Sequence, residues 1–162
     1  MSRSISTFIC VGANLGWYPL LVGSRNKDTQ LFAFECNPEF YKLLDVNLKN
    51  NGIKCQISNE AISNFVFSAP LYMPMGGNAG MSTLFPAEGE TDSDLVITHV
   101  PVTSIDNYFR KRSISNGEVL ILMDIEGVED KALEGAKFFL ETFRPTLILE
   151  INSKLLAQAD SD

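Results

Sequence analysis

The chain has few of the residues from which metal, disulfide and nucleic-acid sites are built. Its 162 residues include one histidine and three cysteines. The 13 Lys and Arg residues are outnumbered by 20 Asp and Glu residues. Cys10, Cys36 and Cys55 have no CxxC or Cys–His spacing, so neither a disulfide framework nor a zinc site is predicted, and each is expected to be a small buried hydrophobe. A net charge of −7 disfavours a nucleic-acid partner, which would require a basic face.

Membrane and secretion signals are also missing from the sequence. No apolar run is long enough to span a bilayer, and the start has no positively charged segment followed by an apolar core. We therefore expect a cytoplasmic protein without a membrane partner. A length of 162 residues favours a single domain over 1–162 with a core of ordinary size.

Strand and helix patterns alternate along most of the chain. Nearly continuous apolar runs are typical of strands that are covered on both faces, so we expect an α/β fold with a mostly parallel sheet and helices on both faces. The segments 65–73 and 96–102 look like two further strands around a Gly-, Ser- and Asn-rich stretch. The sheet strands are predicted over 8–11, 31–35, 54–57, 119–124 and 146–151, and the helices over 15–23, 38–51 and 131–142.

The strand predicted over 146–151 lies at an edge of this sheet, and nothing in the sequence is left to cover that edge. An uncovered strand edge is a liability in an isolated protein. We expect either a fragment, truncated at both ends and lacking C-terminal strands, or a partner such as a second copy that covers the edge.

A glycine turn and a carboxylate form the most informative motif. Gly12 and Gly16 bound a turn after the first predicted strand, and Glu35 ends the second. Such a turn lets the backbone approach a ligand, and the carboxylate can accept hydrogen bonds from both ribose hydroxyls. Asn14 replaces the middle glycine of a dinucleotide turn, and no Lys-Ser/Thr follows. A nucleoside without phosphates is therefore favoured as the ligand, and S-adenosylmethionine is the common ligand of this kind. The less favoured alternative is a glycine-containing helix start that binds no ligand.

Carboxylates also follow the strand predicted over 119–124. In open parallel sheets, ligands bind beyond the carboxyl ends of the strands where the strand order reverses, so Asp124 is expected to flank this crevice with Gly12. Strand alternation predicts that Asp124 and Glu126 point in one direction. Alternatively, Glu126 and Glu129 begin a helix and interact with its dipole. A divalent cation held by Asp124, Glu126 and Glu150 is a weaker alternative, and no metal site is predicted.

Three further features have both functional and structural interpretations. Asn59, Glu60 and Ala61 follow the third strand and would border an adenine, or form a polar turn. His99 is the one candidate histidine base, although a structural or surface histidine is favoured. The glycine-rich segment 76–84 forms either a flap over a substrate or a hairpin tip.

Taken in order, these motifs resemble the FkbM family of S-adenosylmethionine-dependent methyltransferases. The resemblance covers about 8–152 and implies a Rossmann-like class I methyltransferase fold. It also implies S-adenosyl-L-methionine as cofactor and O-methylation of a small-molecule hydroxyl, on a sugar or secondary metabolite. It rests on residues 11–16, 33–38, 77–84, 100–106, 124–129, 133–136 and 144–150.

The resemblance also implies roles for individual residues. Asp124 and Glu126 would lie beside the methyl group and the acceptor, as the catalytic pair. Cys10 occupies the position of a usual aspartate, whose charge-assisted hydrogen bonds a thiol cannot make. One competing hypothesis is a truncated, non-catalytic module with this fold. Another is a nucleotide-dependent oxidoreductase, which the glycine spacing disfavours. The implied cofactor contacts are Gly12, Ala13, Asn14, Gly16, Glu35, Asn37, Glu60, Ala61 and Asp124.

Overall fold

The computed structural model describes residues 4–75, 82–84 and 95–151. Most of the glycine-rich segment predicted as a flap or hairpin tip therefore lies outside the described residues. The elements are β1 (Ile5–Val11), α1 (Trp17–Arg25), β2 (Gln30–Phe34), α2 (Pro38–Asn50), β3 (Gln56–Ser58), β4 (Ala61–Ile62), β5 (Phe67–Pro74), β6 (Leu95–Thr103), α3 (Ile105–Phe109), β7 (Glu118–Met123), α4 (Glu129–Glu134), α5 (Lys137–Phe143) and β8 (Thr146–Leu149).

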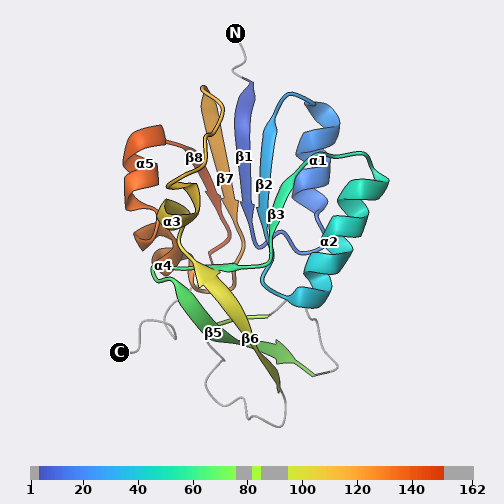
Figure 1. The fold of residues 1–162 in the computed structure, drawn as a ribbon, viewed down its shortest axis with the longest axis vertical. Helices are drawn as coiled ribbons and strands as arrows, with labels where there is room; N and C mark the ends of the chain where they lie inside the picture. Colours follow the sequence, from blue (N-terminus) through green and yellow to red (C-terminus); the bar gives the residue numbers. More distant parts are fainter. Residues whose placement is uncertain (1–3, 76–81, 85–94, 152–162) are drawn as a thin grey trace.

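Five of these strands form one parallel sheet in the order β3-β2-β1-β7-β8 (Figure 1). β1 is central, with β2 beside it in one direction and β7 in the other. The chain builds β1, β2 and β3 outward and then returns to add β7 and β8 on the opposite side. The strand order therefore reverses between β1 and β7, and the predicted α/β fold with a mostly parallel sheet is confirmed.

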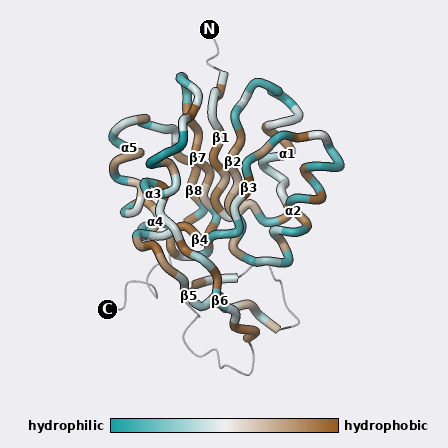
Figure 2. Tube along the Cα trace, in the orientation of Figure 1, coloured by the Kyte–Doolittle hydropathy of each residue, from teal (hydrophilic) through white to brown (hydrophobic). Residues whose placement is uncertain are grey.

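Helices cover both faces of this sheet, as predicted (Figure 1). Along β1, Phe8 and Cys10 point into the apolar cluster on one face, while Ile9 and Val11 point into the cluster on the other. α1 and α2 cover the first face, and α3, α4 and α5 cover the second. Figure 2 shows hydrophobic residues concentrated in the central strands, which explains why their sequences are apolar without alternation.

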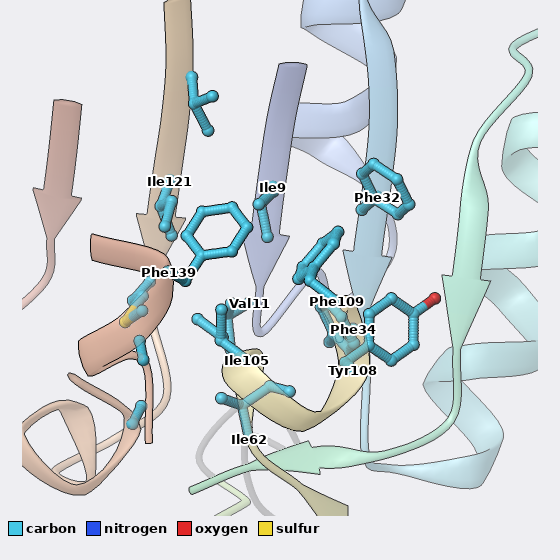
Figure 3. Close-up of a cluster of buried hydrophobic side chains, with 14 residues drawn as sticks. Ile9, Val11, Phe32, Phe34, Ile62, Ile105, Tyr108, Phe109, Ile121 and Phe139 are labelled. Carbon is cyan, nitrogen blue, oxygen red and sulfur yellow. The ribbon is translucent and has the colours of Figure 1, made fainter. Parts of the chain in front are cut away.

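Aromatic side chains fill the second face. The rings of Phe32 and Phe109 lie 4.9 Å apart edge to face, and Phe109 also contacts Phe139 at 4.9 Å between ring centroids. Figure 3 shows these rings, from β2, α3 and α5, gathered over Ile9 and Ile121 of the sheet. The short helix α3, which has too few residues to show a helical period, is thus held by burial of Ile105, Tyr108 and Phe109.

A second sheet, in the order β4-β6-β5, lies at the carboxyl end of the first (Figure 1). β5 and β6 form the antiparallel pair expected from segments 65–73 and 96–102. Leu71 and Val100 point from it into a buried cluster with Val128, which precedes α4. The second sheet therefore packs over the strand ends where the predicted crevice lies.

The single helix predicted over 131–142 is wrong, because α4 and α5 are separate helices. They break at Gly135, where an added Cβ would lie 2.2 Å from the carbonyl oxygen of Ser63. α5 starts without a cap from its own sequence, and the carboxylate of Asp106 accepts hydrogen bonds from Phe138 N and Phe139 N at 3.0 and 2.8 Å. The break thus depends on contacts with distant residues, which periodicity does not reveal.

Asp106→Ala is expected to lower the free energy of unfolding by about 1–2 kcal/mol, the usual effect of deleting a helix cap. Two backbone N–H groups at the start of α5 lose their acceptor in this variant. Urea denaturation measures the change, and Asp106→Asn, which keeps one carbonyl oxygen, should lose less. An unfolding midpoint of Asp106→Ala equal to that of the wild type would contradict this role.

β8 forms the sheet edge that the sequence predicted to be uncovered. Thr146, Leu147 and Ile148 are exposed, and β8 pairs only with β7 within the described residues.

Among all the residues that the structure describes, no helix is both long and apolar enough to cross a membrane.

Candidate functional site

A pocket lies where the strand order reverses, at the carboxyl ends of β1, β2 and β7. The space between its walls, together with the open mouth, is about 620 Å³. Of the predicted site residues, Ala13, Gly16, Asn37 and Glu126 do not line it. The lining residues are Val11, Gly12, Asn14, Phe34, Glu35, Cys36, Phe40, Glu60, Ala61, Ile62, Leu71, Ser82, Thr83, Leu84, Asp124, Ile125 and Val128.

The glycine turn is anchored to both neighbouring strands. Gly12 N and Ala13 N donate to the carbonyl of Phe34 at 3.0 and 2.8 Å. Gly12 has φ +79°, and an added Cβ would lie 1.8 Å from the carbonyl oxygen of Asp124. The structural reason for this glycine is therefore the close approach of the chain after β7. Gly16 ends the turn at the start of α1, where an added Cβ would meet the side chain of Leu44.

Glu35 organises the turn that it faces. Its carboxylate accepts hydrogen bonds from Asn14 N at 2.7 Å and Asn37 N at 2.8 Å, and the residue is 6% exposed. Burial raises the pKa of this carboxyl, and the two backbone N–H groups partly offset the effect. Each carboxylate oxygen can accept more than one hydrogen bond, so Glu35 retains acceptor capacity toward the pocket that it lines.

Two asparagines near this carboxylate have structural roles. Asn37 begins α2, and its side-chain oxygen accepts from Glu39 N and Phe40 N. Asn59 donates from Nδ2 to the carbonyl oxygens of Glu35 at 2.7 Å and Cys36 at 3.1 Å. Asn37 thus caps α2, and Asn59 holds the chain at the end of β2. The positions of the two residues in the sequence do not distinguish these roles from ligand contact.

Part of the pocket lining is apolar. Ala61 is buried and lies in this part with Ile62 and Leu71. Glu60 also lines the pocket, and its carboxylate accepts a hydrogen bond from the hydroxyl of Ser58. Residues 60 and 61 therefore both line the pocket.

The acidic segment after β7 is a folded loop. β7 ends at Met123, and Glu126 has φ +55°, so strand alternation does not extend from Asp124 to Glu126. Asp124 lines the pocket and Glu126 does not. Glu129 is the first residue of α4, and its buried carboxylate accepts from Ile125 N and Gly127 N. The structural interpretation of Glu129, as the start of a helix, is confirmed.

The pocket is strongly acidic. Three carboxylates, Glu35, Glu60 and Asp124, line it, and its described lining has no lysine or arginine. The pKa of Asp124 is raised by burial and then by the nearby Glu150 and Glu129 carboxylates. Burial and Asp124 likewise raise the pKa of Glu126. Such a pocket attracts a cation with hydroxyl donors and disfavours a phosphate.

Asp124→Asn is expected to stabilise the protein at neutral pH. A raised pKa means that the folded state favours protonated Asp124, so stability is lost as pH rises from about 3.9, the unfolded value, through the folded value. The variant should melt at a higher temperature than the wild type at pH 7.5, and the difference should shrink as the pH is lowered to 4. Thermal melts at both pH values measure this, and a variant less stable at pH 7.5 would contradict it.

The histidine and cysteine side chains considered as candidates either lie outside this pocket or line it without supplying a catalytic group. His99 is exposed on β6, opposite Pro70 in the strand pair, as its structural interpretation predicted. Cys10 is fully buried on the α1–α2 face of the sheet, and burial raises its pKa. Cys36 lines the pocket, and burial raises its pKa to about 12, so its thiol is protonated at neutral pH.

Within the described ranges no group of three or more His, Cys, Asp or Glu is placed to hold a metal.

Comparison with known proteins gives the family of this chain. The family model of the Methyltransferase FkbM domain matches residues 11–159. The chain belongs to the FkbM methyltransferase family. The resemblance seen in its sequence motifs is thereby confirmed.

A solved structure and the curated proteins complete the comparison. The crystal structure of methyltransferase FkbM from Methylobacillus flagellatus KT matches with a TM-score of 0.59 and 16% sequence identity. The match covers 90% of this chain and 32% of that chain, so the present chain spans about a third of its neighbour's length. This likeness supports the fold assignment. No curated protein matches the chain.

Proposed function

We propose that the chain binds S-adenosyl-L-methionine and transfers its methyl group to a hydroxyl of a small molecule, such as a sugar or secondary metabolite. The acidic pocket at the reversal of strand order is the observation that carries this proposal. Family membership supports methyl transfer as the reaction class. The acceptor and its hydroxyl are inferred from the FkbM resemblance.

The residues of the pocket fit this cofactor. Its sulfonium and ammonium groups are cations and its ribose offers two hydroxyl donors, all of which suit carboxylates. Glu35 would accept from the ribose and Asp124 would face the sulfonium, with Asn14 beside them in the turn. The apolar wall of Ala61 and Leu71 suits an adenine ring, with Glu60 at its edge. A dinucleotide fits poorly, because its pyrophosphate would meet these carboxylates without a cation to balance it.

The chemistry divides between the cofactor and the chain. When bound, the cofactor supplies an electrophilic methyl group on sulfur. The residues of the chain would hold the acceptor oxygen close to this group, and such positioning contributes several kcal/mol to catalysis. Asp124 orients the hydroxyl or takes its proton, and Glu126 lies close enough in the acidic loop to influence Asp124 electrostatically.

A methyl-transfer assay tests this function. The chain is incubated with methyl-labelled S-adenosylmethionine and a panel of hydroxylated sugars and phenols. We expect label in one acceptor class, with one S-adenosylhomocysteine formed for each methyl transferred. Asp124→Asn should reduce turnover at least about 100-fold, within the range for loss of an acid–base group. Turnover of Asp124→Asn equal to that of the wild type would remove Asp124 from the mechanism.

The exposed β8 edge favours a second candidate function, a non-catalytic module that acts through a partner. Leu147 and Ile148 are exposed at this edge, and the buried Cys10 cannot make the hydrogen bonds of the usual aspartate. Weak or absent cofactor binding by folded protein would favour the module. If a second copy covers the edge, sedimentation velocity should show a dimer that Ile148→Lys dissociates.

A further inference from the structure

A short segment, residues 82–84, lines the pocket without a role in the proposed reaction. Thr83 pairs with Tyr72 of β5 through two backbone hydrogen bonds. Tyr72 N donates to the carbonyl of Thr83 at 2.9 Å, and Thr83 N donates to the carbonyl of Tyr72 at 3.0 Å. Leu84 is buried in the apolar cluster under the same sheet. The second sheet therefore holds this segment against the pocket.

Thr83 also contacts the acidic loop that follows β7. Its hydroxyl donates a hydrogen bond to the carbonyl oxygen of Glu126 at 3.2 Å. Glu126 has φ +55°, a left-handed backbone conformation that is unfavourable for residues other than glycine. Such a conformation persists only where surrounding contacts enforce it. The hydrogen bond from Thr83 is one of these contacts, and it joins the loop to the second sheet.

The rest of the loop is held from within by the first residue of α4. The carboxylate of Glu129 accepts hydrogen bonds from Ile125 N at 3.3 Å and from Gly127 N at 3.1 Å. These bonds hold the residues on either side of Glu126, whereas Thr83 holds Glu126 itself. The backbone that carries the acidic side chains is thus fixed from two directions.

Ser82 links the same segment to the part of the pocket that contains Glu35. Asn37 Nδ2 donates to the hydroxyl of Ser82 at 3.4 Å, and Asn37 N donates to the carboxylate of Glu35 at 2.8 Å. Residues 82–84 therefore contact both a residue that holds Glu35 and the loop that begins with Asp124. Both of these carboxylates line the pocket.

We propose that Thr83 is a positioning residue for methyl transfer, which holds the acidic loop so that Asp124 meets the acceptor hydroxyl. This inference rests on the proposed function. Without the Thr83 hydroxyl, Glu126 is free to leave its left-handed conformation, and Asp124 moves with the loop. Transfer slows as a result, because a misplacement of about 1 Å can cost about 100-fold in rate. Cofactor affinity changes little, since Glu35 and the charge of Asp124 are both retained.

The kinetics of Thr83→Val test this proposal, because valine keeps the shape of the side chain and lacks the hydroxyl. We expect kcat to fall about 10- to 100-fold, while the affinity for S-adenosylmethionine in titration calorimetry stays close to that of the wild type. Thr83→Ser, which keeps the hydroxyl, should restore most of kcat. Thr98→Val on β6, outside the pocket lining, is the matched control and should keep the wild-type kcat. A wild-type kcat for Thr83→Val, or an equal loss of kcat and affinity, would overturn the proposal.

Amide hydrogen exchange in the free protein separates this proposal from the proposed function. Exchange at Ile125 and Gly127 should be several-fold faster in Thr83→Val than in Thr98→Val, because the loop opens more often when Glu126 is released. Equal exchange in the two variants would show that Thr83 does not hold the loop. If the wild type transfers no methyl group, the proposed function fails, and the exchange rates still decide whether Thr83 fixes the loop.

Discussion

Glu35→Ala is expected to lower the affinity for S-adenosylmethionine by at least about 100-fold. Hydrogen bonds to a charged group contribute about 1.5–3 kcal/mol each, and two are expected between this carboxylate and the ribose. The same carboxylate holds Asn14 N and Asn37 N, so its loss also removes the turn that the ligand would contact. Titration calorimetry measures the affinity, and unchanged affinity would exclude Glu35 from the site.

The stability of this variant separates the two roles of Glu35. Glu35→Ala leaves two largely buried N–H groups without their acceptor, which costs about 2–5 kcal/mol of unfolding free energy. Glu35→Gln keeps one acceptor oxygen and is the matched control. It should lose roughly half as much stability and retain measurable binding, with an affinity between those of the wild type and Glu35→Ala. Urea denaturation of all three proteins gives the comparison.

Gly12→Ala is expected to destabilise the fold by more than about 3 kcal/mol. The positive φ of +79° is strained for alanine, and the new Cβ would lie 1.8 Å from the carbonyl oxygen of Asp124. Since this oxygen belongs to the main chain after β7, β1 and the acidic loop must move apart. Ligand affinity should fall with stability, because Asp124 lines the pocket.

Gly52→Ala separates the cost of backbone strain from the cost of a steric clash. Gly52 has a similar φ of +64°, but an added Cβ would meet no atom within 4 Å. It should therefore show only the backbone cost, about 1–2 kcal/mol. Urea denaturation of both variants measures the difference, and equal losses for Gly12→Ala and Gly52→Ala would show that the contact with Asp124 does not matter.

The location of the pocket was predictable because it depends on local signals and one topological rule. Gly12, Glu35 and Asp124 each follow a strongly apolar strand, and parallel strands place their carboxyl ends at one edge. The rule that ligands bind where strand order reverses then brings these three residues together. The structure places all three in one pocket.

Other features depend on partners distant in sequence and could not be predicted. The break between α4 and α5 is set by Ser63 and Asp106, which no helical period in 129–143 reveals. Asn37 is a short polar residue after a strand, as a ligand contact would be, yet it caps α2. Short elements such as β4 also escape pattern analysis, because two residues cannot show a strand period.

Titration calorimetry with S-adenosylmethionine is the most direct test of whether the pocket binds this cofactor. We expect micromolar binding to the wild type and at least about 10-fold weaker binding to Asp124→Asn, which lacks one charge facing the sulfonium. Because Asp124→Asn should be at least as stable as the wild type at neutral pH, its weaker binding cannot come from unfolding. Absence of binding to wild-type protein with a cooperative unfolding transition would contradict the proposed cofactor site.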